Sequence, residues 1–255
     1  MIPKTNLKLQ NQVLSRDWKN IRIGITGATG TLGRALIKTF HSKGAFVVGF
    51  THGSENKNNK SVENPDEWVH WECGKERDVE SYLMNLDILI LNHGINIHSN
   101  ISNEGVSKSL EVNALSSWRL IEIFESICLK NNCSKNRELW INTSEAEVQP
   151  ALSPAYEISK RLIGQLASIK LGNKTNKELG NLKIRKLILG PFKSKLNPLG
   201  IMSPDFVANQ IALQANYKCN LIIVTPNPLT YILIPLNELI RLIYLKLFSS
   251  SNLKR

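Results

Sequence analysis

Cysteine is scarce in this chain of 255 residues, and the few cysteines present are widely scattered. No two of them form a C-x-x-C pair, and no histidines accompany them at metal-ligand spacing. This pattern excludes a disulfide scaffold and a zinc-binding module, so no metal site is expected. It indicates free thiols in a reducing compartment. The four cysteines are Cys73, Cys128, Cys133 and Cys219.

No signal peptide is expected at the start of the sequence. Its N-terminal residues, MIPKTNLKLQNQVLSRDWKN, contain no apolar core of the signal-peptide kind. No apolar run is long enough to span a membrane without charged residues inside it. A cytoplasmic location is therefore expected.

Clustered charge is a third absence, although the formal net charge is +11. The Lys and Arg residues are spread along the chain, without long basic runs and without aromatic residues interleaved among them. That distribution argues against nucleic-acid binding. Hydrophobic residues make up 42% and charged residues 21%, which is typical of a folded globular protein.

Short apolar runs alternate with helix-like segments along most of the chain. The run DILILN (87–92) is continuously apolar, as in a strand buried on both faces, whereas residues 31–42 have the apolar spacing of a helix. The alternation predicts an α/β fold, with a doubly wound parallel sheet between two helical layers in a single domain. The predicted strands are 21–26, 45–50, 69–71, 87–92, 138–143, 183–189 and 221–225, and the predicted helices are 31–42, 79–84, 107–131, 154–171 and one capped by Ser203.

Composition divides the chain into three parts: a polar extension (1–20), the α/β domain (21–228), and an apolar helix with a basic tail (229–255). In the last part, Leu229–Phe248 is mostly apolar, with Pro235 near the expected helix start and charged breaks such as Glu238 and Arg241. These charges argue against a membrane-spanning helix. Because apolar residues surround much of the segment, burial is expected, while pairing with a partner or peripheral membrane contact stays open.

The first predicted strand leads into a glycine-rich turn, ITGATGTLGRAL, which opens a predicted helix. Glycine there permits a tight turn, lets backbone N–H groups approach a pyrophosphate, and lets helix and strand pack closely. The helix N-terminus adds unpaired N–H donors and a positive dipole end. The turn therefore predicts a dinucleotide site. The residues expected to contact the dinucleotide here are Gly27, Thr29, Gly30, Thr31, Leu32 and Gly33.

The motif T-G-x-x-G-x-x-G at 26–33 resembles the cofactor loop of short-chain dehydrogenases/reductases, in the spacing of their extended and atypical members. The commoner spacing has a glycine where this chain has Thr31. A second segment, DILILNHG (87–94), resembles the family's D-x-L-V-N-N-A-G segment: Asn92 and Gly94 match, and Leu91 and His93 depart. The resemblance implies a Rossmann-type fold with strand order 3-2-1-4-5-6-7, and Asn92 and Gly94 beside the cofactor.

The segment AYEISK places Tyr156 and Lys160 four residues apart, on one face of a predicted helix. A phenol has a pKa of about 10, and a nearby ammonium group lowers it by stabilising the phenolate. Tyr156 could then exchange a proton with a carbonyl or alcohol oxygen during hydride transfer. The resemblance implies that both residues also contact the cofactor. Glu157 departs from the family, in which a small residue usually follows this tyrosine.

Two further groups would complete the family's catalytic set. The segment INTSEAEV offers Thr143 and Ser144 as the hydroxyl that polarises the substrate oxygen. Ser144 is favoured, and Thr143 stays open. Asn113 matches the family residue that holds a water between the lysine and solvent. Glu145 and Glu147 are expected either to bind substrate or to face solvent.

No acidic residue stands at the end of the second predicted strand, where it would bind the ribose hydroxyls of NAD. Thr51 and His52 are expected to contact the cofactor there, so NADP is favoured while NAD stays open. At the nicotinamide end, the family's Pro-Gly order is reversed to Gly190-Pro191, and Pro191 is expected near the carboxamide. The candidates to meet a 2′-phosphate are Arg34, His52, Lys57 and Lys60.

These resemblances imply an oxidoreductase that transfers a hydride between NAD(P)H and a small carbonyl or alcohol substrate. The apolar C-terminal part hints that this substrate is hydrophobic. They also imply a homodimer or homotetramer built on the helices that begin near Ser107 and Pro154. The alternative is a dinucleotide-binding sensor or scaffold without catalysis, associated with a membrane surface through the C-terminal helix.

Four segments together, NHGIN, NTSEAEV, YEISK and LILGPFKS, also resemble the dehydrogenase part of bifunctional sterol desaturase/short-chain dehydrogenase proteins. The desaturase half of such proteins needs clusters of metal-binding histidines. The five histidines of this chain form no such cluster in the sequence, so no desaturase activity is expected.

Overall fold

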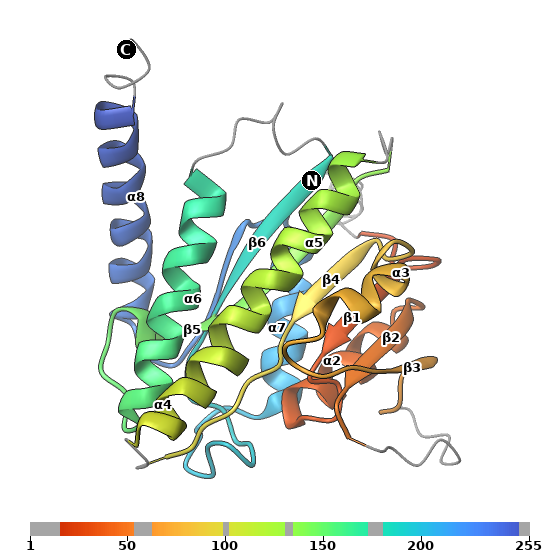
Figure 1. Ribbon diagram of the computed structural model, residues 1–255, viewed down its shortest axis with the longest axis horizontal. Coiled ribbons are helices and arrows are strands. Elements are labelled where there is room, and N and C mark those ends of the chain that lie inside the picture. The colour runs from red at the N-terminus through yellow and green to blue at the C-terminus, as the bar shows by residue number, and fades with distance from the viewer. Residues whose placement is uncertain (1–15, 54–62, 99–101, 131–134, 173–180, 250–255) are drawn as a thin grey trace, which may run out of the picture.

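The computed structural model describes residues 16–53, 63–98, 102–130, 135–172 and 181–249, without the side chains of 245, 246, 248 and 249. The strands form one sheet with parallel pairing throughout, in the order β3-β2-β1-β4-β5-β6-β7 (Figure 1). This topology confirms the predicted doubly wound α/β fold, and its parallel strands share one carboxyl edge. The strands are β1 (Arg22–Thr26), β2 (Phe46–Thr51), β3 (Glu67–His70), β4 (Ile88–Leu91), β5 (Arg137–Ser144), β6 (Leu182–Leu189) and β7 (Leu221–Val224).

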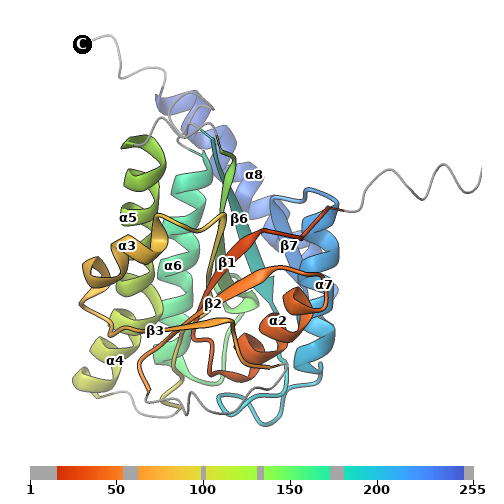
Figure 2. The same cartoon turned by 90° about the vertical axis from the view of Figure 1, so that its right-hand side faces the viewer.

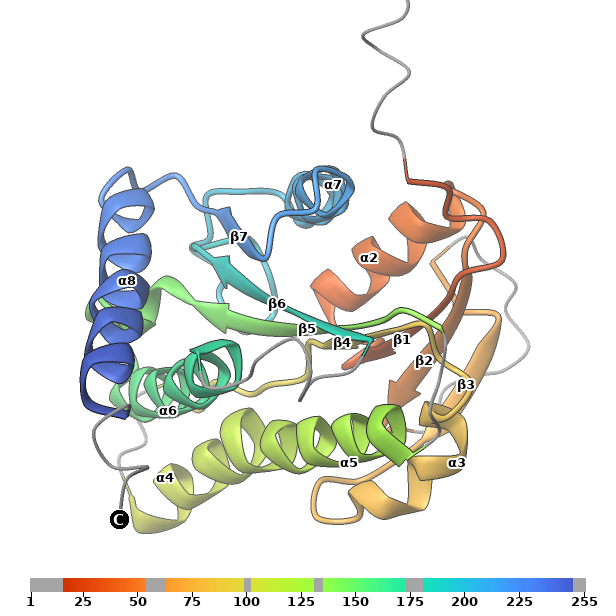
Figure 3. The ribbon, with the colours of Figure 1, turned by 90° about the horizontal axis from the view of Figure 1, so that it is seen from above.

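Helices cover both faces of the sheet, which gives the three predicted layers (Figures 2 and 3). One face carries α2 (Thr31–His41) and α7 (Pro204–Asn216), and the other carries α3 (Glu80–Leu83), α4 (Asn103–Leu110), α5 (Ser116–Lys130) and α6 (Pro154–Gly172). The predicted cap of α7 is present, because Ser203 Oγ accepts a hydrogen bond of 3.2 Å from Phe206 N.

Each face of the sheet has its own apolar core. In β4 the side chains alternate: Ile88 and Ile90 join the core under α2 and α7, whereas Leu89 and Leu91 join the core under α5 and α6. All four are buried, which explains the continuously apolar sequence of this strand. Trp140 of β5 is fully buried, with its ring centroid 5.9 Å from that of Phe40.

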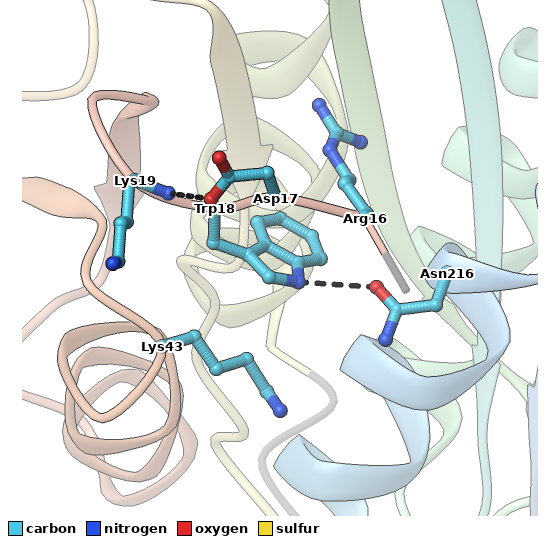
Figure 4. A pocket seen from close by; sticks show the side chains of 6 residues that line it. All are labelled: Arg16, Asp17, Trp18, Lys19, Lys43 and Asn216. Carbon is cyan, nitrogen blue, oxygen red and sulfur yellow. Dashed lines mark hydrogen bonds between the residues drawn. The ribbon is translucent and has the colours of Figure 1, made fainter. Parts of the chain in front are cut away.

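The segment before β1 closes the amino edge of the sheet. Trp18 is buried in the core, and its Nε1 donates a 3.1 Å hydrogen bond to Asn216 Oδ1 at the end of α7 (Figure 4). The hollow in Figure 4 is lined by residues that precede β1, β2 and β7, so it lies at the amino edge, opposite the carboxyl ends of the strands. Its position separates it from the predicted cofactor and catalytic residues.

The predicted helix 107–131 differs from the structure in two ways. It begins earlier, at Asn103, because Ser102 Oγ accepts a hydrogen bond from Gly105 N and caps α4. It is also interrupted by a π-helical turn, Glu111–Leu115, between α4 and α5. Such turns insert one residue into a helix and occur often at functional sites. Asn113 lies inside this one.

The C-terminal helix, α8 (Thr230–Ser249), stands at the β7 edge of the sheet beside α6 (Figures 1 and 3). The expected burial of this segment is wrong: among its described side chains, ten large apolar ones between Tyr231 and Leu247 are exposed, while Ile234 is buried against β6 and β7. Pro235 lies inside the helix, not at its start. Within the described residues, none of the helices has the length and apolarity needed to cross a lipid bilayer.

Candidate active site

The loop after β1 approaches its neighbours so closely that only glycine fits. Gly27 has a φ of +64°, and a Cβ there would lie 2.8 Å from the Cα of His93. A Cβ on Gly33 would lie 2.8 Å from the Cα of Ala28 and closer still to the Gly27 carbonyl. The loop therefore turns tightly and keeps its backbone bare, as the predicted contact with a pyrophosphate requires.

The N-terminus of α2 opens at the end of this loop. Gly30 is its N-cap, no described side chain caps it, and its first turn contains no acidic residue. Its first N–H groups and positive dipole end thus suit an anion. The Arg34 Nε donates a 3.2 Å hydrogen bond to the Thr29 carbonyl, which holds a guanidinium beside the loop. These residues fit the dinucleotide phosphates.

A single hydroxyl joins β1 to the segment after β4. Thr26 Oγ1 accepts hydrogen bonds from the backbone N–H groups of Asn92 (2.9 Å) and His93 (3.2 Å), and lies 2.8 Å from His93 Nδ1. The His93 ring is buried, edge-on to Trp71 at 4.9 Å. Burial, aided by the charge of Lys160, lowers the pKa of the imidazole to about 3. His93 is thus a neutral packing residue beneath the glycine loop.

Tyr156 and Lys160 lie on one face of α6, as their spacing predicts. Lys160 Nζ lies 5.7 Å from the centre of the Tyr156 ring and donates a 3.3 Å hydrogen bond to the Asn142 carbonyl of β5. Burial lowers the pKa of Lys160 to about 8, while the charge of Glu147 opposes this. Burial also raises the pKa of the Tyr156 phenol, a hydrogen bond with Ser144 lowers it, and the charge of Glu145 raises it.

The two candidate hydroxyls of β5 point to different places. Thr143 Oγ1 donates a 3.0 Å hydrogen bond to the Leu187 carbonyl of the neighbouring strand, so this hydroxyl links β5 to β6. Ser144 ends the strand, and its hydroxyl neighbours the Tyr156 phenol while accepting a 3.2 Å bond from Ala146 N. This geometry favours Ser144.

Asn113 joins three segments from inside the π-helical turn. Its Oδ1 accepts a 2.7 Å hydrogen bond from Ile95 N, and its Nδ2 donates to the Ile95 carbonyl (3.0 Å) and to Ser159 Oγ (2.8 Å). Both amide hydrogens are therefore used to hold the segment after β4 against α6. Gly94 lies beside this amide, since a Cβ there would be 3.1 Å from Asn113 Oδ1. The predicted role of Asn113 in holding a water stays a prediction.

The remaining predicted cofactor contacts lie at two edges of the site. Thr51 is buried at the end of β2 and its Oγ1 accepts from Gly53 N, whereas His52 is exposed. Pro191 follows β6, and its carbonyl accepts from Ile201 N (3.0 Å) and Met202 N (3.2 Å), which folds the loop 191–202 back on itself. The predicted phosphate ligands Lys57 and Lys60, and the thiol of Cys133, lie outside the described residues.

The two acidic residues near the site, Glu145 and Glu147, are both bound by other side chains of the protein. Glu145 Oε2 accepts from Thr225 Oγ1 (2.6 Å) and Thr230 Oγ1 (3.2 Å), which ties the end of β5 to the start of α8. Glu147 is buried and pairs with the Lys186 ammonium at 2.6 Å. Solvent exposure is therefore wrong for Glu147, whereas substrate binding by either glutamate stays a prediction. Among the described residues, no group of His, Cys, Asp or Glu side chains is arranged to hold a metal ion.

Two residues near the site, Asn142 and Lys186, are not found from the sequence, and the contact of a third, Glu157, is not foreseen by its departure from the family. Asn142 Nδ2 donates a 3.0 Å hydrogen bond to Asn92 Oδ1, which connects β5 to the cofactor segment after β4. Glu157 accepts from Ala151 N at 2.8 Å and so fixes the loop before α6. Lys186 is fully buried in β6. The signal for Asn142 and Lys186 was a polar residue inside a buried strand, which demands a partner.

The doubly wound sheet, the glycine loop, and Tyr156 and Lys160 beside Ser144 define a short-chain dehydrogenase/reductase. More narrowly, the chain belongs to the NAD dependent epimerase/dehydratase family, whose model matches residues 23–160. That match spans the glycine loop and all three of these side chains. The chain therefore binds NAD(P).

Individual proteins resemble the chain in sequence or in fold. It is 38% identical to a monoglucosyldiacylglycerol epimerase of Synechocystis sp. over 236 residues, which are 92% of this chain and 56% of that relative. The chain thus spans little more than half the length of this relative.

Two solved structures show the fold at low identity. One is an aldohexose dehydrogenase of Thermoplasma acidophilum (TM-score 0.65, 15% identity, covering 82% of this chain and 94% of the other). The second is a short chain dehydrogenase of Burkholderia cenocepacia in complex with NADP (TM-score 0.70, 14% identity, covering 86% and 93%).

Proposed function

We propose that this protein is an epimerase that inverts the configuration at a carbon bearing a secondary hydroxyl on the sugar of a glycosylated lipid. It would use bound NADP for hydride transfer and Tyr156 as the acid-base group. The observation that carries the proposal is the placement of Tyr156 between Ser144 and Lys160, at the carboxyl edge where the glycine loop also opens. The dinucleotide, when bound, supplies the acceptor and then the donor of a hydride.

In the first half of the proposed reaction, Tyr156 takes the proton of the substrate hydroxyl while the carbon loses a hydride, which leaves a ketone. In the second half, the hydride returns to the opposite face of that carbon, and Tyr156 gives the proton back to the oxygen. Lys160 favours the phenolate form of Tyr156 through its charge. Ser144 donates a hydrogen bond to the substrate oxygen as negative charge develops there.

Two features support a lipid-linked sugar as the substrate. The relative of known activity acts on monoglucosyldiacylglycerol, and the similarity covers 92% of this chain. The loops around the site also expose apolar side chains: Leu152 before α6 is 95% exposed, and Leu199 in the loop after β6 is 80% exposed. Exposed apolar groups beside a site suit a ligand that carries acyl chains.

The test supplies glucosyldiacylglycerol in mixed micelles with NADP(H) far below the substrate concentration. Hydrolysis and chromatography of the sugar then detect its epimers. We expect more epimer than cofactor, with no net change in absorbance at 340 nm, since an epimerase regenerates its cofactor. A net dehydrogenase would consume cofactor in step with product.

The matched variants are Tyr156→Phe and Tyr217→Phe, because Tyr217 lies at the far end of α7, near the amino edge. Tyr156→Phe should lower turnover by about 10²–10⁴-fold and leave NADPH binding unchanged, whereas Tyr217→Phe should change neither. Cofactor binding without turnover of any sugar lipid or carbonyl would instead indicate a dinucleotide sensor or scaffold.

A further inference from the structure

The amphipathicity of α8 is inverted. Its polar side chain Glu238 faces the domain and accepts from Ser168 Oγ at 2.6 Å and from the buried Lys186 Nζ at 2.8 Å. Its large apolar side chains point away from the domain, with Ile240 58% and Leu247 64% exposed. A helix that used its apolar face for folding would show the opposite arrangement. The outer face of α8 is therefore built to contact something apolar.

From these observations we propose that the outer face of α8 lies on the surface of a lipid bilayer, where it brings the enzyme to its lipid substrate. The substrate part of this statement rests on the proposed function, whereas the bilayer contact stands on the helix itself.

The width of the apolar face favours a fluid surface over a protein partner. At about 100° per residue, the ten exposed apolar side chains cover an arc of roughly 220° around the helix. A stripe that packs against another helix is nearer 100° wide. A bilayer interface can surround such a broad face, because lipid chains adapt to its shape.

The residue types on this face also match a bilayer interface. Tyr244 is exposed there, and tyrosine is favoured at the level of the lipid headgroups. Glu238 is the one acidic residue in the sequence of α8, and it is paired with Lys186 inside the domain. The outer face thus carries no negative charge, and the net charge of +11 adds attraction to anionic lipids.

The first turn of α8 is joined to the rim of the active site. Thr230 Oγ1 accepts a 2.8 Å hydrogen bond from Gln149 Nε2, in the loop that also carries Leu152. Asn227 Nδ2 donates to Gln149 Oε1 at 2.6 Å and fixes the same two segments together. A bilayer in contact with α8 would therefore lie next to the loops through which a lipid-linked sugar must enter.

The test is flotation of the purified chain with phosphatidylcholine vesicles, prepared with and without phosphatidylglycerol. We expect the chain to float with both and more strongly with the anionic vesicles. The double variant Ile240→Gln/Ile243→Gln should lower partitioning about 100-fold, at about tenfold for each side chain withdrawn from the lipid. Leu213→Gln, at an exposed apolar position of α7 across the sheet, should leave partitioning unchanged.

The proposal would be overturned if the wild-type chain stayed at the bottom of the gradient, or if the double variant floated like the wild type. It would also be overturned if the double substitution left flotation unchanged but converted a dimer to a monomer in analytical ultracentrifugation. That result would make α8 an interface between two copies of the chain. NADPH binding by the double variant checks that it is folded. Flotation needs no turnover, so an enzyme that floats but epimerises no sugar lipid would contradict the proposed function alone.

Discussion

Replacing Lys160 with methionine should stabilise the protein while it removes catalysis. Lys160 is only 6% exposed, and burial lowers its pKa from 10.5 to about 8. This difference corresponds to about 3 kcal/mol of unfavourable free energy for keeping the ammonium charged in the folded state. Methionine leaves the Asn142 carbonyl without this donor, which costs about 1 kcal/mol. The net gain in the free energy of unfolding at pH 7 is then about 2 kcal/mol.

The gain should depend on pH in a defined direction. Between pH 8 and 10.5 the folded state binds fewer protons at Lys160 than the unfolded state does, so wild-type stability from this group rises with pH. The unfavourable free energy of keeping Lys160 charged in the folded state is fully present below pH 8 and is absent above pH 10.5. The advantage of Lys160→Met should therefore be constant near neutral pH and shrink as the pH rises through this window.

Urea unfolding, followed by tryptophan fluorescence at pH 7, 8, 9 and 10, measures this dependence. The control is Lys170→Met on the same helix, because Lys170 is also buried but pairs with Glu122 and Glu125, and these bonds raise its pKa. Lys170→Met should destabilise the protein at neutral pH. A Lys160→Met protein that unfolds at lower urea than the wild type at pH 7 would refute the reasoning.

Three further substitutions separate catalysis from structure. Ser144→Ala should lower turnover about 10²–10³-fold without weakening NADPH binding. Thr143→Ala should keep turnover and lower the free energy of unfolding in urea by about 1 kcal/mol. Equal loss of turnover in both variants would contradict the assignment of Ser144. Gly33→Ala should weaken NADPH binding in a fluorescence titration and cost about 1–3 kcal/mol, because its Cβ would meet the backbone of Gly27. Asn113→Ala removes three hydrogen bonds and should lower the free energy of unfolding by about 2–3 kcal/mol. It should also lower kcat more than it raises KM. Unchanged unfolding in urea would show that these bonds do not stabilise the fold.

The fold could be predicted from the sequence because its signals are local. Most strands are short apolar runs, the helices between them have the apolar spacing of helices, and Ser203 marks the start of α7 as its cap. The glycine loop and the Tyr156–Lys160 pair also depend on near neighbours in the chain. The choice between Thr143 and Ser144 was harder, because it depends on where β5 ends to within one residue.

The misjudged features depend on contacts between distant segments. Nothing near Asn113 in the sequence announces the π-helical turn, which its bonds to Ile95 and Ser159 accompany. The burial of α8 was overestimated because composition shows how many apolar residues a helix has, not which side its polar residues face. That side is set by Lys186, which lies 52 residues upstream of Glu238.

The pairing of Lys186 with Glu238 has a consequence for how related sequences can vary. Loss of Glu238 alone would leave Lys186 with a single acidic partner, and loss of Lys186 would bury two carboxylates together, Glu238 and Glu147. Positions 186 and 238 should therefore change together when related sequences are aligned. The outward positions of α8 should instead exchange freely among apolar residues. Aligned relatives should therefore show free variation on the outer side of the helix and covariation with position 186 on its inner side.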